Sequence, residues 1–317
     1  MNTKHIIDPV DVSLIEGELT PERFLRVTNK CDNHIYILDG NECPNTMREI
    51  GRLREIAFRA AGGGTGTPCD IDEFDVMEHP CKQLIVWDPE ARQIIGGYRF
   101  ITGADMRTDE NGDPCIATSH MFNFSEKFKR EYLPKTIELG RSFVRLECQS
   151  TRAGSKALFA LDNLWDGLGA LTVVHPEIKY LFGKVTMYPG YLPQCRNMIL
   201  YFMHKYFPDH DSLVRPKEPL NTNMDVEAMR RLFSGKDFRE DYRTLNGEVH
   251  RYGYNIPPLV NAYMGLSPSM RMFGTAINRE FGDVEESGIF FVIDEIYEAK
   301  KQRHIDTFCV NEDVAVR

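Results

Sequence analysis

The first third of the chain alternates between strand-like and helix-like patterns of apolar residues. His34–Gly40 alternates apolar and polar positions and ends in a turn signal, which predicts a strand. Gln83–Trp87 and Gln93–Thr102 predict two more strands, joined as a hairpin. Between the first strand and this hairpin, Asn45 and Thr46 are expected to cap a helix. Its apolar positions recur every three or four residues, at Met47, Ile50, Leu53, Ala57 and Ala60.

The centre of the chain has the most regular pattern. It predicts two strands and two helices in alternation: Thr136–Leu146, Ser155–Leu171, Tyr180–Met187 and Pro193–Phe207. Strand, helix and strand in that order predict a parallel pair joined by a right-handed crossover.

The last third is less regular. Residues 209–255 are charged and loop-rich, with one helix expected near residues 225–233. An apolar helix is expected at Pro257–Leu266 and a strand at Gly288–Ile293. Together these elements predict an α/β fold with a mixed sheet.

Composition limits the class of protein. The chain has 317 residues, of which 42% are hydrophobic, and a formal charge of -9, which is typical of a globular protein. The acidic balance argues against general nucleic-acid binding, which needs a basic surface. The eight cysteines form no CxxC pair, and no apolar run is long enough to span a bilayer or act as a signal segment. We therefore expect a cytoplasmic protein with free thiols.

Several familiar cofactor, metal and catalytic-serine motifs are missing. The sequence has no GxGxxG, P-loop, HExxH or GxSxG motif. The glycines at 62–64 follow the predicted helix, so we expect a helix stop and a loop, with a lid over a substrate as the alternative. The acidic run at 70–75 begins like a calcium loop, but Phe74 stands where an oxygen ligand is needed. We expect no metal site.

The strand near residue 140 contains both a carboxylate and a guanidinium. Strict alternation would place Glu138 and Arg141 on opposite faces, with Arg141 among apolar neighbours, where an unpaired charge is costly. A β-bulge at Gly140 would bring both side chains to one face and free backbone N–H groups to point at a ligand. A structural ion pair at a sheet edge is the alternative.

The segment that opens the central helix is suited to an anion. Arg152, Gly154, Ser155 and Lys156 lie where unpaired N–H groups and the positive end of the helix dipole would face a phosphate. Residues 126–156 contain eight basic and four acidic residues, a local charge of +4 in a chain whose total is -9. An ordinary capped helix N-terminus is the alternative.

The order of the elements resembles the GNAT acyltransferase fold. More specifically, the chain is similar to the branch that includes ornithine-lipid and glycine-lipid N-acyltransferases, often called haemolysin-like, which is distantly similar to acyl-homoserine-lactone synthases. The resemblance runs from about residue 45 to 295 and rests on five ordered segments: Arg54–Arg59, Asp70–Asp75, Gly97–Phe100, Glu138–Val144 and Ile256–Leu259. It implies a GNAT-like mixed sheet with flanking helices in a single domain, 1–317. A core of about 31–207 would be followed by a C-terminal extension, 208–317, that completes the sheet.

The resemblance also implies a function. It implies transfer of a fatty acyl group, here expected to be 3-hydroxyacyl, from acyl carrier protein to the α-amine of an amino acid such as glycine or ornithine, in aminolipid synthesis. No permanently bound cofactor is expected, and the hydrophobic product would allow peripheral contact with a membrane. In the lactone synthases the matching positions gather around the acceptor and the acyl thioester. Here these are Arg54, Asp72, Asp75, Arg99, Glu138 and Arg141.

At the donor site the sequence departs from the family. Relatives that use coenzyme A carry [RQ]-x-x-G-x-[GA] at the helix entrance, whereas residues 149–154 place Arg152 where the first glycine belongs. A side chain there crowds the pyrophosphate path and favours acyl carrier protein, whose phosphopantetheine has one phosphate. The alternatives are a lactone-type signal synthase, a coenzyme-A-dependent acetyltransferase, and a non-catalytic module that binds lipid or carrier protein.

The expected reaction is attack of an amine on an acyl thioester. Amines are mostly protonated at neutral pH, so the acceptor needs a base. Glu138 is the expected base, directly or through one water, with Asp72 or Asp75 as substitutes. Arg99 or Arg141 would bind the acceptor carboxylate.

Two further roles complete the expected mechanism. A backbone N–H near Phe143 or Val144 would polarise the thioester carbonyl. Tyr188 or Tyr191, after the next strand, would protonate the leaving thiol.

Overall fold

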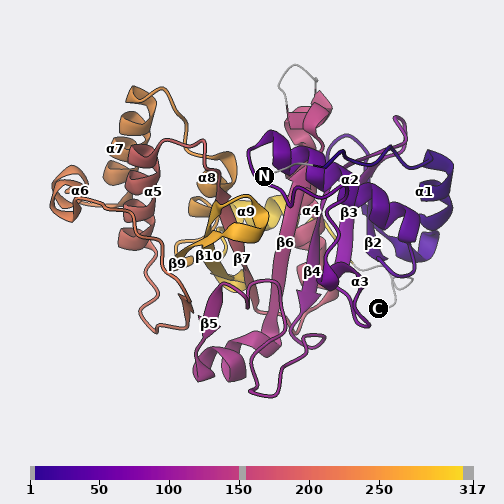
Figure 1. Ribbon diagram of the computed structural model, residues 1–317, viewed down its shortest axis with the longest axis horizontal. Coiled ribbons are helices and arrows are strands. Elements are labelled where there is room, and N and C mark those ends of the chain that lie inside the picture. Colours follow the sequence, from indigo (N-terminus) through magenta and orange to yellow (C-terminus); the bar gives the residue numbers. More distant parts are fainter. Residues whose placement is uncertain (1–3, 150–154, 310–317) are drawn as a thin grey trace.

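The computed structural model describes residues 4–149 and 155–309, and of residues 155–158 the backbone alone. An eight-stranded sheet runs through the molecule in the order β1-β2-β3-β4-β6-β7-β10-β9 (Figure 1). Its strands are β1 (Phe24–Val27), β2 (His34–Asp39), β3 (Lys82–Asp88), β4 (Gln93–Thr102), β6 (Thr136–Val144), β7 (Tyr180–Met187), β9 (Arg271–Asn278) and β10 (Val284–Val292). Neighbouring strands are antiparallel except β6 and β7, which are parallel. The predicted mixed α/β sheet is confirmed, and β9 and β10 continue it beyond β7.

Helices flank this sheet, and a separate two-stranded ribbon pairs β5 (Phe122–Phe124) with β8 (Val214–Pro216). The helices are α1 (Val12–Glu18), α2 (Pro44–Ala60), α3 (Glu73–Val76), α4 (Ser155–Val174), α5 (Pro193–Tyr206), α6 (Val226–Leu232), α7 (Phe238–Arg251), α8 (Pro258–Met264) and α9 (Glu298–His304). Figure 1 shows α1 and α2 near the N-terminal strands, with α5 and α7 together at the opposite end. Helix α4 connects the parallel strands β6 and β7, as predicted.

The start of α2 differs from the sequence prediction. Cys43 is the N-cap and makes no side-chain cap bond, and the helix begins at Pro44. The carboxylate of Glu18, at the end of α1, instead accepts the backbone N–H groups of Asn45 at 3.0 Å and Thr46 at 2.7 Å. A negative charge from another helix therefore satisfies the free N–H groups, so Asn45 and Thr46 are capped and do not act as caps. The helix buries four predicted apolar positions: Met47, Ile50, Leu53 and Ala57.

Several elements had not been predicted, among them β1, α7 and β9. Strand β1 precedes the expected first strand and is only four residues long, too short for alternation to be recognised. Helix α7 lies in the segment expected to be loop-rich, where it packs aromatic side chains such as Phe238 against Phe202 of α5. In β9, Gly274 interrupts the apolar pattern with a φ of 92°. Each element depends on a tertiary partner more than on its own sequence pattern.

The two faces of the sheet are covered differently. On the face covered by α4, here called the α4 face, one continuous apolar core runs across the strands. On the other face, the α2 face, the apolar side chains form two separate clusters, one under α2 and one around Phe128. Between the clusters the strands carry charged or polar side chains, including Arg99 on β4, Lys184 on β7 and Glu286 on β10. The candidate site occupies this gap.

Candidate active site

A β-bulge in β6 sets the orientation of the central charged residues. β6 has one more residue than β4 between consecutive ladder pairs, and Arg141 absorbs the difference with a φ of 50°. The bulge had been predicted one residue earlier, at Gly140. The predicted convergence of the two side chains holds: Glu138 and Arg141 line the cavity from the α2 face, whereas Leu139 packs on the α4 face. That backbone N–H groups of the bulge point at a ligand stays a prediction.

The parallel strands separate next to this bulge. The ladder between β6 and β7 ends at the pair Leu139 and Gly183. A Cβ at Gly183 would lie 2.8 Å from the carbonyl oxygen of Leu139, so only glycine allows the close approach of this last pair. Beyond it the ladder stops, and a cavity of about 1080 Å³ includes residues of both sheet faces in its lining. The cavity therefore passes through the sheet between β6 and β7.

The cavity has two chemically distinct arms. The polar arm, on the α2 face, is lined by Asp72, Arg99, Glu138, Arg141, Lys184 and Glu286. The apolar arm, on the α4 face, is lined by Leu164, Trp165, Leu168, Tyr263, Leu266 and Phe291. A molecule bound through the opening would place a charged end in one arm and a hydrocarbon end in the other.

A buried ion network supports the polar arm from beneath. Arg54 of α2 donates Nη1 to both carboxylate oxygens of Asp75 at 3.1 Å and Nη2 to Gln83 at 2.5 Å. Arg99 Nη1 lies 3.2 Å from Asp75 and 2.5 Å from Asp72. Burial alone raises the pKa of Asp75, but the guanidinium groups of Arg54 and Arg99 outweigh it and hold that pKa well below its ordinary value.

The sequence had placed Arg54 and Asp75 among the substrate-binding residues. Both side chains are fully buried, and neither lines the cavity. Their geometry assigns them to the support of Asp72 and Arg99, which do line it.

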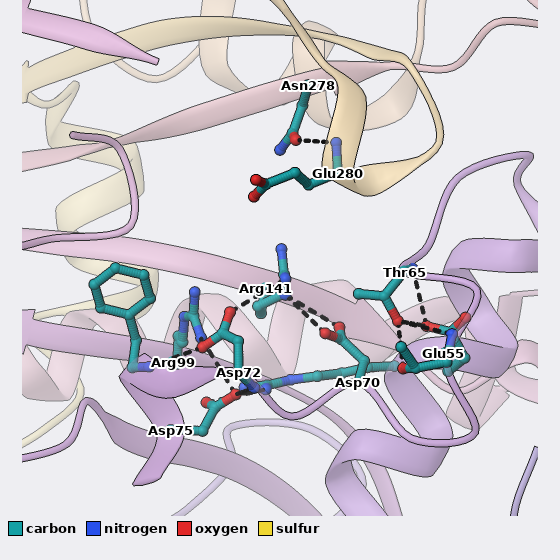
Figure 2. A network of polar contacts seen from close by, with 12 residues as sticks. Glu55, Thr65, Asp70, Asp72, Asp75, Arg99, Arg141, Asn278 and Glu280 are labelled. Atoms are coloured by element: carbon teal, nitrogen blue, oxygen red, sulfur yellow. Dashed lines mark hydrogen bonds and ion pairs between the residues drawn. The ribbon is translucent and has the colours of Figure 1, made fainter. Parts of the chain in front are cut away.

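Arg141 lies at the cavity side of the network (Figure 2). It donates Nε to Asp70 and Nη2 to Asp72, both at 3.2 Å, and its guanidinium carbon lies 4.4 Å from the ring centroid of Phe281. Figure 2 shows its third nitrogen pointing away from both aspartates, toward Glu280. Nη1 has no hydrogen-bond partner among the described residues and remains available as a donor to an anion.

The acidic run at 70–75 forms a helix cap. Asp72 caps α3 by accepting the N–H of Phe74 at 3.0 Å, and Asp75 accepts the N–H of Asp72 at 3.1 Å. This reciprocal capping box fixes both carboxylates toward the arginines. No group of side chains suited to a metal ion occurs in the part of the chain that the structure describes.

The glycine-rich loop after α2 is held by a buried carboxylate. Glu55 accepts the backbone N–H groups of Thr65 at 3.1 Å and Gly66 at 2.7 Å (Figure 2). Thr65 also lines the cavity, so this loop is a fixed part of the cavity wall.

Two predicted catalytic groups reach the polar arm. Glu138 is 4% exposed, and its carboxylate accepts the backbone N–H of Thr118 at 3.0 Å. Burial raises the pKa of Glu138, against the opposing effects of Thr118, Lys184 and Arg99. Burial also raises the pKa of Tyr188 to about 12, so its phenol is protonated at neutral pH.

Sequence reasoning missed a second polar group in this arm. Lys184 Nζ lies 2.8 Å from Glu286 Oε2, which also accepts a hydrogen bond from Asn278 at 3.1 Å. His120 lines the same arm, and burial, assisted by Lys184, lowers its pKa. Lys184 interrupts a largely apolar strand, which was a usable signal, whereas Glu286 precedes the strand expected at Gly288–Ile293 and His120 lies in a connection without a pattern.

The structure describes only part of the predicted donor site. The side chains of Phe143 and Val144 pack on opposite faces and do not line the cavity, so their expected role rests on backbone N–H groups. Arg152 and Gly154 lie outside the described residues, as do the side chains of Ser155 and Lys156.

The local positive charge of residues 126–156 is partly neutralised in the fold. Six of its eight basic side chains are described by the structure, and four of these six form ion pairs with carboxylates: Lys127, Lys129, Arg141 and Arg145. Several of the partners come from outside this segment, as Asp211 does for Lys127. The net charge counted from the sequence therefore overstates the basic surface that a partner would meet.

Comparison with known proteins places this geometry in a family. Residues 53–158 match the model of the acetyltransferase (GNAT) domain. A glycine N(alpha)-acyltransferase of Bacteroides thetaiotaomicron is 64% identical over 99% of this chain and 93% of its own length. The chain belongs to the GNAT acyltransferase family. A second acyltransferase of the same name, from Phocaeicola vulgatus, is 60% identical over 99% of this chain and 96% of its own length.

These relatives establish an acyltransferase that acts on an amine. No solved structure matches the chain. Within residues 4–149 and 155–309, none of the helices combines the length and apolar character that crossing a bilayer requires.

Proposed function

We propose that this acyltransferase moves a fatty acyl group, expected to be 3-hydroxyacyl, from acyl carrier protein to the α-amine of glycine, in aminolipid synthesis. The cavity between β6 and β7 carries the proposal, because it joins a charged arm to an apolar arm. A zwitterionic amino acid fits the charged arm, and a hydrocarbon chain fits the apolar arm. The names of the two relatives favour glycine over ornithine as the acceptor.

The reaction forms an amide bond and breaks a carbon–sulfur bond. The amine nitrogen attacks the thioester carbonyl carbon, and Glu138 accepts the proton that the nitrogen loses. The resulting oxyanion collapses and expels the thiolate, which takes a proton from Tyr188. After each turnover Glu138 gives its proton to solvent and the Tyr188 phenolate takes one back, so that one N–H and one C–S bond are replaced by one C–N and one S–H bond. A positioned base contributes ~10²–10⁴ in rate, whereas alignment of the two reactants supplies roughly 7–11 kcal/mol. The largest contribution of the cavity is therefore to hold amine and thioester together.

Glu138 is a better base than the acidic alternatives. Asp72 is bonded to both Arg99 and Arg141, and Asp75 is fully buried between Arg54 and Arg99. Both carboxylates already accept hydrogen bonds from guanidinium groups, and the lowered pKa of Asp75 makes it a poor proton acceptor. The raised pKa of Glu138 brings it closer to the working pH of a general base.

Arg141 is the proposed anchor for the acceptor carboxylate. Its Nη1 points into the polar arm, whereas Arg99 is 3% exposed and its Nη1 lies between Asp72 and Asp75. A charge-assisted hydrogen bond from Arg141 would orient the amino acid without disturbing the network below it.

His120 is a competing candidate for the base. It lines the polar arm, and its lowered pKa leaves the ring neutral and able to accept a proton at neutral pH. Glu138→Gln and His120→Gln separate the two roles, because the variant that lacks the base should lose the acidic limb of the pH–rate profile.

The donor assignment rests on the helix entrance. Arg152 stands where relatives that use coenzyme A have a glycine, which favours a donor with a single phosphate. The same reasoning leaves a coenzyme-A-dependent acetyltransferase and a lactone-type signal synthase as competing outcomes. We also propose peripheral membrane contact, since an N-acylated amino acid partitions into lipid.

Product mass after single-donor incubations tests the proposed function. The purified protein would be given acyl carrier protein loaded with a 3-hydroxyacyl or an unmodified acyl chain, or the matching coenzyme A thioesters, with isotopically labelled glycine, ornithine or S-adenosylmethionine. We expect labelled N-acylglycine with the carrier-protein donor. Label in N-acylornithine, acetylated product or a lactone, with none in N-acylglycine, would overturn the proposal.

Glu138→Gln tests the base in the same assay. We expect turnover to fall by ~10²–10⁴ while folding and donor binding are retained. Glu110→Gln, at an exposed position outside the cavity, is the matched control and should keep full activity. Unchanged turnover in Glu138→Gln would remove Glu138 from the chemistry.

A further inference from the structure

The apolar arm ends at a wall shared with a second cavity. A smaller cavity of about 400 Å³ lies beyond it, lined by residues of α4, α8 and α9 and by Leu266, which follows α8. Three side chains line both cavities: Leu161, Trp165 and Leu266. These three side chains, here called the end wall, therefore separate the two spaces.

Trp165 is the largest member of the end wall and is held on both sides. Its ring makes an edge contact with Tyr263 of α8, with centroids 5.9 Å apart, and a tilted contact with His304 of α9, at 6.4 Å. The ring therefore contacts both α8 and α9, and its surroundings depend on how closely α9 lies against α4.

That closeness is fixed by two features of α4. His304 Nδ1 lies 2.7 Å from the carboxylate of Asp166, the residue after Trp165. A Cβ at Gly169 would lie 2.0 Å from the carbonyl oxygen of His304, so only glycine allows α9 to come this near. The end wall is therefore a rigid part of the fold.

We propose that Trp165 sets the upper limit on acyl chain length by closing the apolar arm. This inference rests on the proposed function, in which the arm holds the acyl chain. The arm suits a hydrocarbon because its side chains are aliphatic or aromatic. Their polar atoms are the phenol oxygens of Tyr98 and Tyr263 and the indole nitrogen of Trp165, and the Tyr98 hydroxyl already donates to the Leu164 carbonyl at 3.3 Å. A chain that fills the arm meets the Trp165 ring, and each further methylene has no room.

The test is a chain-length series on a variant that opens the wall. Wild type and Trp165→Leu would be compared with acyl carrier protein loaded with saturated chains that increase by two carbons at a time. Since one methylene in an apolar pocket discriminates by about tenfold or more, we expect kcat/KM for chains beyond the wild-type optimum to rise by about that factor relative to shorter chains. An unchanged ratio would overturn the proposal.

Two further variants control for folding and test the mechanism. Trp87→Leu makes the same change at the other tryptophan, which is buried on the α2 face, and should leave the length preference unaltered. Ala262→Phe, in the second cavity alone, should restore the wild-type preference when combined with Trp165→Leu. If the double variant still prefers longer acyl chains than wild type, the proposed role of the end wall is also contradicted.

Direct binding keeps the inference separate from catalysis. Affinities of free fatty acids of increasing length, measured by calorimetry, should show a cut-off in wild type that moves to longer chains in Trp165→Leu. If wild type makes no N-acylglycine but the length cut-off moves in Trp165→Leu, the proposed function is wrong and the role of Trp165 in limiting chain length is supported. If N-acylglycine forms but Trp165→Leu changes neither the length cut-off nor the product lengths, only the role of Trp165 is contradicted.

Discussion

The two faces of the central sheet are built from the same strands but stabilised in different ways. The α4 face is one apolar core, in which side chains gain stability by leaving water. The α2 face divides its apolar residues into two clusters and places buried charges between them. Those charges are tolerated only because each has a partner. Variants on the α2 face should therefore lose stability or turnover, whereas variants in the apolar arm should change chain preference.

Removing the deepest carboxylate should have the largest effect on stability. Asp75→Asn leaves Arg54 and Arg99 buried without their shared anion, and breaking such a buried pair costs about 3–5 kcal/mol. Denaturant unfolding measures this loss, with the exposed Asp8→Asn as the matched control. A loss no larger than that of the control would show that the α2 face does not depend on its ion network.

Acid should affect wild type and Asp75→Asn differently. The folded pKa of Asp75 is depressed, so its contribution is present above the ordinary aspartate value of about 4 and disappears as pH falls through the folded pKa. The stability difference between wild type and Asp75→Asn should therefore shrink as the solution is acidified. A difference that grows toward low pH would contradict the assigned direction.

The strand separation is tested by two glycine substitutions. Gly183→Ala places a Cβ 2.8 Å from the Leu139 carbonyl and should destabilise the fold by about 1–3 kcal/mol. Gly140→Ala places its Cβ no closer than 3.6 Å to Arg99 and should be tolerated. Equal thermal unfolding midpoints for the two variants would mean that the last β6–β7 pair is not tightly constrained.

The bulge predicts a smaller difference at Arg141. Both Arg141→Ala and Arg141→Gly lose the ion pairs and should lose acceptor binding, seen as a raised KM for glycine. Only glycine relieves the φ of 50°, so Arg141→Gly should be more stable than Arg141→Ala by about 1 kcal/mol. The reverse order of stability would argue against a left-handed backbone at this position.

The pH dependence of turnover should show the smallest of the predicted effects. Because burial raises the pKa of Glu138, the base becomes protonated at a higher pH than an ordinary glutamate, and activity falls as pH drops through that raised value. The acidic limb of kcat/KM should therefore lie above the ordinary glutamate value of about 4.3. A limb at or below that value would exclude Glu138 as the titrating base.

The sequence was most informative where local patterns and chemistry agree. The alternation around Glu138 and Arg141 predicted a bulge, and the structure moves it by one residue because Arg141 itself takes the left-handed conformation. The E-x-x-R spacing could therefore identify the polar arm. It could not separate residues that line the cavity from Arg54 and Asp75 beneath it, since that depends on tertiary burial.

The features that the sequence did not predict depend on contacts between residues far apart in the chain. The Glu18 carboxylate that caps α2 comes from a different helix, and Lys184 meets Glu286 across two strands that are distant in sequence. The end wall requires α4, α8 and α9 together. No local pattern in the sequence predicts these contacts between distant elements.

The most direct test is a crystal structure of the protein with a long-chain N-acylglycine. We predict the glycine carboxylate at Arg141 and the amide within reach of Glu138. The acyl chain should pass between β6 and β7 and end against Trp165. An acyl chain that stays on the α2 face, or a head group bound away from Glu138, would contradict the assignment of the head group to the α2 face and of the acyl chain to the α4 face.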